Sequence, residues 1–288
     1  MDKAVVDRPE VSVVYVASDD TRTLRRMLTN VKELATSLEV IVVSPKCVDT
    51  SYLGDESSWI DKIVSPSIYS YDEGRALGAR HARGETVLFL DERVDFSLPL
   101  WQQYVDAVRN GADVAVTVRT QTSTSAKKKK PLPTRYAYRL LNHLLGHTEL
   151  GTGTLSRIPF ACSRKALKAL GHECLRTPPI AYVKAAWQKL VVVGVHPDSA
   201  IKWTDDTRIS MVKSTRQLLR EHAHAIQLLV NLIGPRGGMP DGDRYRDLLH
   251  IPGELHLRSV FYPQPREDKG GVWGGKRKKK QTGSHKKR

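Results

Sequence analysis

The order of apolar and polar positions along the chain predicts strands that alternate with helices over the first two thirds of its length. Continuous apolar runs rich in β-branched residues predict buried strands, and apolar residues three and four positions apart predict helices. The alternation predicts an α/β fold in three layers, with a mainly parallel central sheet between two layers of helices. The expected strands are 11–17, 39–43, 61–64, 86–90, 112–118, 155–160 and 191–195, and the expected helices are 21–36, 74–83, 100–109, 136–145, 180–189 and 208–233.

The stretch from Glu73 to Asp95 holds the leading candidate for a site. A helix that we expect Gly84 to end is followed by an apolar strand, and this strand leads directly into the charged residues Asp91, Glu92 and Arg93. Ligands of open α/β sheets bind outside the carboxyl ends of the strands, so Asp91 stands where a binding or catalytic carboxylate is expected. The alternative interpretation is a charged surface turn after a buried strand.

Residues 78–91, GARHARGETVLFLD, resemble the central segment of family 2 glycosyltransferases. In that family a helix, an A-x-G-E turn and an apolar strand lead into an Asp-x-Asp motif, which holds a divalent metal, Mg²⁺ or Mn²⁺, on the diphosphate of a nucleotide sugar. Asp91 matches the first carboxylate of the motif, and Arg93 stands at the position of the second. The resemblance implies a GT-A fold, the fold of nucleotide-diphospho-sugar transferases.

The same resemblance implies roles for five further carboxylate or histidine residues. Asp19 and Asp20 follow the first strand and Asp49 follows the second, where the family binds the nucleotide; capping of the next helix is the alternative for Asp19 and Asp20. Glu173 stands near the position of the family's catalytic base, so Asp91 and Glu173 are the catalytic candidates. His196 follows the last strand and is a candidate ligand of the metal or diphosphate, or simply a hydrogen-bonded structural residue.

The activity implied by the resemblance is transfer of a sugar from a nucleotide sugar to a hydroxyl group of a glycan, lipid or protein acceptor. Arg93 leaves two alternatives open. It either contacts the donor diphosphate in place of the metal, or it repels the metal in a catalytically inactive GT-A scaffold that binds an anionic surface or polymer. No nucleic-acid-binding motif occurs, so a specific nucleic acid is not an expected partner.

The charge of the chain is concentrated in two short segments. The 288 residues carry a formal net charge of +15, and the segments 127–130 and 276–288 supply four and eight lysine or arginine residues. Without these twelve charges the net charge falls to +3, so the basicity belongs to a loop and a C-terminal tail. Such a tail lacks a core-forming pattern; we expect it to be disordered and to make peripheral contact with an anionic membrane.

The remaining features define the expected compartment and domain boundaries. Three scattered cysteines fit a reducing compartment, and no signal peptide or membrane-spanning apolar run is found, so a cytoplasmic location is expected. The expected divisions are an N-terminal extension at 1–10, the GT-A domain at 11–200, a helical extension at 201–268 and the basic tail at 269–288.

Overall fold

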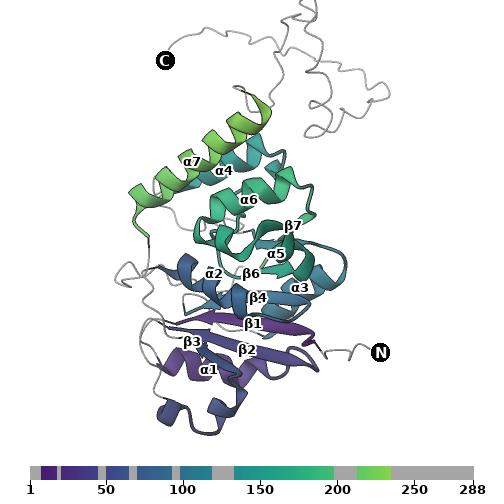
Figure 1. Cartoon of the computed structure of the whole chain (residues 1–288), viewed down its shortest axis with the longest axis vertical. Coiled ribbons are helices and arrows are strands. Elements are labelled where there is room, and N and C mark those ends of the chain that lie inside the picture. The colour runs from purple at the N-terminus through teal and green to yellow at the C-terminus, as the bar shows by residue number, and fades with distance from the viewer. Residues whose placement is uncertain are drawn as a thin grey trace, which may run out of the picture. The chain divides into compact units, whose positions relative to one another are not determined.

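A seven-stranded mixed sheet forms the centre of the structure (Figure 1). The computed structural model describes residues 8–17, 21–44, 50–64, 70–92, 98–118, 133–197 and 213–234, which all fall within one unit that spans residues 1–248. The strand order is β3-β2-β1-β4-β6-β5-β7, and only β6 runs against the direction of the others. The strands are β1 (Val11–Val16), β2 (Leu38–Val43), β3 (Lys62–Val64), β4 (Thr86–Asp91), β5 (Val114–Thr117), β6 (Phe160–Ser163) and β7 (Val192–Val195).

Helices pack on this sheet and on one another. Helix α2 packs against β1 and β2, α3 packs against β4, β5 and β6, and α7 lies on α4 and α6 (Figure 1). The mainly parallel α/β arrangement predicted from the alternating pattern is therefore confirmed. The helices are α1 (Thr21–Val31), α2 (Tyr71–His81), α3 (Leu98–Arg109), α4 (Pro133–Leu144), α5 (Arg164–Leu170), α6 (Pro178–Trp187) and α7 (Thr215–Ile233), with short 3-10 helices η1 (Thr50–Trp59), η2 (Thr148–Leu150) and η3 (His172–Arg176).

The structure differs from the predicted local structure in several places. The strand expected at 155–160 is wrong: the chain turns there and β6 begins only at Phe160. Pro159 explains the shift, because it has no N–H group to donate to a sheet ladder. The helix η1 was not predicted. Helix α7 begins at Thr215, where the Ser214 hydroxyl accepts a hydrogen bond from the Gln217 N–H at 3.2 Å, whereas residues 208–212 of the expected helix lie outside the described residues.

Gly84 does not end helix α2. The helix starts after Ser70, whose hydroxyl accepts a hydrogen bond from the Glu73 N–H at 3.2 Å, and it ends at His81. Gly84 instead allows the turn before β4 to approach β1. A Cβ atom at this position would lie 2.5 Å from the backbone nitrogen of Ser12, too close for any side chain. Gly84 does lie between α2 and β4, but a glycine is needed there for close packing against β1 and not to end the helix.

The turn Ala82-Arg83-Gly84-Glu85 is hydrogen-bonded to the amino ends of β1 and β2. Glu39 on β2 is buried and accepts hydrogen bonds from the Arg83 guanidinium at 2.6 Å, the Arg83 N–H at 2.8 Å and the Ser12 hydroxyl, which in turn accepts from the Gly84 N–H at 2.7 Å. Burial alone would raise the pKa of Glu39, but these hydrogen bonds outweigh it and lower that pKa. This part of the family-like segment is therefore structural, since it lies at the amino ends of β1 and β4.

The described residues include no helix with both the length and the apolar character needed to cross a lipid bilayer. The basic loop at 127–130 and the basic tail lie outside the described residues, so the expectations for them stay predictions.

Candidate functional site

The carboxyl ends of β1 and β4 mark the topological switch point of the sheet. From β1 the chain adds β2 and then β3 on one side, whereas β4 pairs with β1 on the other side. At such a point the connections leave in opposite directions and open a crevice, where α/β proteins bind their ligands. Asp91 is the last residue of β4, directly opposite Val16 at the end of β1. The sequence therefore placed Asp91 correctly at the end of a strand, and its role in ligand binding stays a prediction.

Asp91 is fully buried and forms an ion pair with an arginine from helix α2. Its Oδ2 atom accepts a hydrogen bond from Nη2 of Arg75 at 2.8 Å. Arg75 is itself 1% exposed, and its Nη1 donates to Oδ1 of Asp72 one turn earlier in α2. The Tyr71 ring lies 6.0 Å from the guanidinium carbon. One guanidinium thus bridges two carboxylates in the interior.

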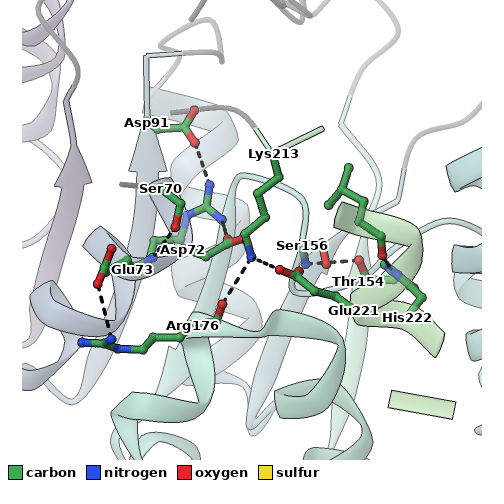
Figure 2. A network of polar contacts seen from close by, with 12 residues as sticks. Ser70, Asp72, Glu73, Asp91, Thr154, Ser156, Arg176, Lys213, Glu221 and His222 are labelled. Atoms are coloured by element: carbon green, nitrogen blue, oxygen red, sulfur yellow. Dashed lines mark hydrogen bonds and ion pairs between the residues drawn. The ribbon is translucent and has the colours of Figure 1, made fainter. Parts of the chain in front are cut away.

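The pairing continues from Asp72 into helix α7, as Figure 2 shows. Nζ of Lys213, two residues before α7, lies 2.8 Å from Oδ2 of Asp72 and 2.6 Å from Oε1 of Glu221. It also donates to the Arg176 carbonyl oxygen at 3.3 Å. We call this series of ion-paired side chains, Asp91–Arg75–Asp72–Lys213–Glu221, the buried charge chain. Its charges alternate in sign, so each side chain lies beside an opposite charge.

Burial and neighbouring charges have opposing effects on the pKa values of Lys213 and Glu221. Burial alone would lower the pKa of Lys213, but the Asp72 and Glu221 carboxylates outweigh it and raise that pKa. Burial raises the pKa of Glu221, the charge of Asp72 adds to this rise, and Lys213 opposes it. Lys213 is therefore held firmly as the cation, and Glu221 is the carboxyl group that protonates more easily than an ordinary glutamate.

Glu173, the candidate base, lies beside the buried charge chain on helix η3. It is exposed, and its carboxylate lies 2.8 Å from Nε of Arg176 and 3.4 Å from Nε2 of His172. Arg176 also pairs with Glu73 in the first turn of α2 at 3.3 Å. These contacts place Glu173 near the amino end of α2, whereas its role as a base stays a prediction.

Among the described residues, the surroundings of Oδ2 of Asp91 disfavour a divalent metal ion. A metal on Oδ2 of Asp91 would lie within about 5 Å of the Arg75 guanidinium, given metal–oxygen distances of about 2 Å. At an effective dielectric constant of about 20, their repulsion is on the order of 7 kcal/mol. Arg75 therefore opposes metal binding at this oxygen.

His196 lies several strands away from Asp91, and its role as a metal or diphosphate ligand stays a prediction. It is exposed and follows β7, which β5 and β6 separate from β4. Three strand spacings amount to about 14 Å, too far for both side chains to reach one ion without a large bend of the sheet. Among the residues that the structure describes, no group of three His, Cys, Asp or Glu side chains is placed to hold a metal.

Four predicted site residues lie outside the described residues: Asp19, Asp20, Asp49 and Arg93. Their proposed roles at the nucleotide and diphosphate stay predictions. Glu92, next to Asp91, accepts a hydrogen bond from the Tyr71 hydroxyl.

Reasoning from the sequence missed Arg75, Asp72, Lys213 and Glu221. Asp72 and Arg75 are three residues apart, but the predicted helix began at Gly74, so the sequence did not indicate that they lie on one helix. Nothing in the sequence indicated that this pair would be buried, or that Lys213 would reach it from a distant segment.

A concave region of about 550 Å³ lies at the opposite edge of the sheet from Asp91 and is lined by Arg8, Glu85, Arg164, Lys165 and Lys168, among others. Several of its charges are already engaged. Arg8 pairs with Glu85 at 3.3 Å, Lys165 pairs with Asp113 at 3.1 Å, and Arg164 donates to backbone carbonyl groups. We therefore place the candidate site at Asp91.

Comparison with known proteins gives a likeness in structure alone. The sequence matches no model of a known protein family and no curated protein. Glucosyl-3-phosphoglycerate synthase from Mycobacterium tuberculosis, in complex with Mn²⁺, UDP and glucosyl-3-phosphoglycerate, superposes with a TM-score of 0.53 at 16% identity, over 81% of this chain and 82% of that chain. Mannosyl-3-phosphoglycerate synthase from Rubrobacter xylanophilus gives 0.53 at 14% identity, over 88% and 80%.

The chain has a GT-A fold. This agrees with the expectation from the sequence and with the mixed sheet, whose one antiparallel strand, β6, separates β4 from β5. At such low identity the likeness extends to the fold and leaves the donor, the acceptor and the metal requirement of this chain open.

Proposed function

We propose that this protein is a glycosyltransferase of the family 2 type that binds a nucleotide sugar at the carboxyl ends of β1, β2 and β4. The observation that carries the proposal is the position of Asp91, at the switch point of a GT-A sheet and in register with the end of β1. Ligands of α/β sheets bind in this crevice. The loops after β1 and β2, which contain Asp19, Asp20 and Asp49, begin at the same edge.

In the proposed reaction the protein orients the donor and stabilises the charge that develops on the leaving diphosphate. Such stabilisation by preorganised positive groups is usually the largest contribution to catalysis of this kind. We assign it to Arg93, which follows Asp91 by two residues, and we assign the proton transfer from the acceptor hydroxyl to Glu173. Arginine suits the first role because its planar guanidinium can donate two parallel hydrogen bonds to phosphate oxygens.

The proposal is tested by screening nucleotides and nucleotide sugars for thermal stabilisation, in EDTA and again in Mn²⁺. The panel contains UDP-glucose, UDP-N-acetylglucosamine, GDP-mannose, UDP and GDP. A donor present at 100 times its Kd should stabilise the fold by about 2.7 kcal/mol, which is readily measured as a rise in Tm. Arg93→Ala should lose that rise, while Arg80→Ala, an exposed arginine on α2, is the matched control.

A donor found in this way would then be tested for transfer to acceptor hydroxyl compounds, including phosphoglyceric acid, which is present in a structure of the similar mycobacterial synthase. Release of UDP or GDP that depends on the acceptor supports the proposal. Absence of binding by every nucleotide and nucleotide sugar, with and without Mn²⁺, contradicts it.

The second candidate function is a catalytically inactive GT-A scaffold that acts as a binding protein at an anionic surface or polymer. The ion pair between Asp91 and Arg75 favours it, because this pair occupies the carboxylate that active relatives are expected to use. Binding of a polyanion such as heparin, without binding of any nucleotide, is the result that this candidate predicts.

A further inference from the structure

The carboxylate at the metal position of the GT-A fold already has a permanent cation inside the protein. The Arg75 guanidinium donates to Oδ2 of Asp91 from a side chain that is 2% exposed, and Asp91 itself is fully buried. Arginine side chains are cations at physiological pH, so the carboxylate lies beside a positive charge. The negative charge that a metal ion would meet is thus balanced before any ligand arrives.

Arg75 is held in place and cannot easily turn away to admit a metal ion. Its second terminal nitrogen donates to Asp72, and Asp72 is fixed in turn by Lys213 at 2.8 Å. The side chain of Tyr71 flanks the guanidinium. Rotation of Arg75 would leave Asp72 and Asp91 with fewer partners in a buried setting, which proteins avoid because unpaired buried charges are strongly unfavourable.

We propose that Arg75 is a built-in replacement for the divalent metal at Asp91, and that the donor site of this protein is independent of metal at this position. The inference rests on the GT-A donor site proposed above, and it differs from the expectation for Arg93. Arg93 was assigned to the donor diphosphate, whereas Arg75 acts on the protein's own carboxylate. Arg75 is a positioning residue in this account, because it fixes the charge and orientation of Asp91.

The inference predicts how metal affinity changes when Arg75 is replaced. Oδ2 of Asp91 and Oδ1 of Asp72 bind two nitrogens of one guanidinium, so the two oxygens lie on either side of it. Without that group, two carboxylates face a small buried space, which is an arrangement that attracts Mn²⁺ or Mg²⁺. Arg75→Met should therefore create metal affinity, and Arg75→Lys, which keeps a positive charge, should not.

The test is a titration of nucleotide-free protein with MnCl₂, in which free Mn²⁺ is measured by electron paramagnetic resonance. Wild type, Asp91→Asn and Arg75→Lys should bind Mn²⁺ equally weakly, and Arg75→Met should bind it at least about tenfold more tightly, a change of about 1.4 kcal/mol. The gain in Arg75→Met should be lost in the double variant that also carries Asp91→Asn. Circular dichroism establishes that each variant is folded.

Two outcomes would overturn the inference. One is Mn²⁺ binding by wild type that is tenfold or more tighter than binding by Asp91→Asn, because Asp91 would then be a metal ligand despite Arg75. The other is a folded Arg75→Met variant that gains no Mn²⁺ affinity. If Arg75→Met does not fold, Arg75→Gln, whose amide can still donate to a carboxylate, takes its place, and the comparison of wild type with Asp91→Asn still decides. No nucleotide sugar is present, so failure of the donor screen and failure of this test are separate results.

Discussion

Replacement of Lys213 by methionine should weaken the fold far more than replacement of an exposed lysine. Methionine fills a similar volume but leaves Asp72 and Glu221, whose oxygens lie 2.8 Å and 2.6 Å from Nζ, without their shared cation. Removal of one partner from a buried ion pair typically costs 3–5 kcal/mol, because the remaining charge stays buried and uncompensated. We expect a loss in this range, about 3–5 kcal/mol at pH 7.5, since only 8% of the Lys213 side chain is exposed.

The loss of stability of the Lys213→Met variant relative to wild type should become smaller as the pH falls. Burial already raises the pKa of Glu221, and Lys213 is the group that opposes this rise. Without Lys213 the pKa of Glu221 should rise further, so this residue is neutral over a wider pH range. A group whose folded pKa is raised favours the folded state below its unfolded pKa, and this contribution is lost as the pH rises through the folded value. The variant therefore recovers part of its stability between pH 7.5 and pH 5.

The measurement is urea-induced unfolding followed by circular dichroism at pH 7.5 and pH 5. Lys165→Met is the matched control: Lys165 pairs with Asp113 at 3.1 Å, but its side chain is 73% exposed, and an exposed pair contributes only about 0–1 kcal/mol. A Lys213→Met loss no larger than that of Lys165→Met, or a deficit that grows on acidification, would show that the charge chain is not the stabilising contact we describe.

Three further predictions follow from other parts of the chain. Gly78→Ala should destabilise the fold by roughly 1–3 kcal/mol in urea unfolding, because its Cβ would lie 2.3 Å from Cγ1 of Val14; an unchanged midpoint would contradict this close packing of α2 on β1. Glu39→Gln should destabilise the protein at pH 7. The deficit should begin to shrink as the pH falls below the ordinary glutamate value of 4.5 and should be lost as the pH falls through the lower pKa of folded Glu39; a pH-independent deficit would contradict this. Deletion of residues 276–288 should weaken binding to vesicles of anionic lipid in low salt, and equal binding by the full and shortened chains would exclude the tail as the contact.

The sequence by itself determined the fold class and the position of one site residue. Apolar runs and helical spacing predicted most strands and helices, because each pattern records which faces of an element are buried. Asp91 was placed correctly because a charged residue directly after a buried strand must lie at the end of that strand. The strand expected at 155–160 failed because Pro159 changes the backbone in a way that hydrophobicity does not report.

Only the tertiary structure decided what surrounds Asp91. Arg75 resembles any arginine in an amphipathic helix, and its burial depends on α2 packing directly against β1 and β2, where Gly78 removes the side chain that would hold them apart. Lys213 and Glu221 reach Asp72 only because α7 packs on α4 and α6. These contacts join segments far apart in the sequence, and no local pattern encodes which distant charge will fill a buried position. The metal site at Asp91 stays a prediction from the sequence, and the structure adds the ion pair with Arg75 on which our proposal of a metal-independent site rests.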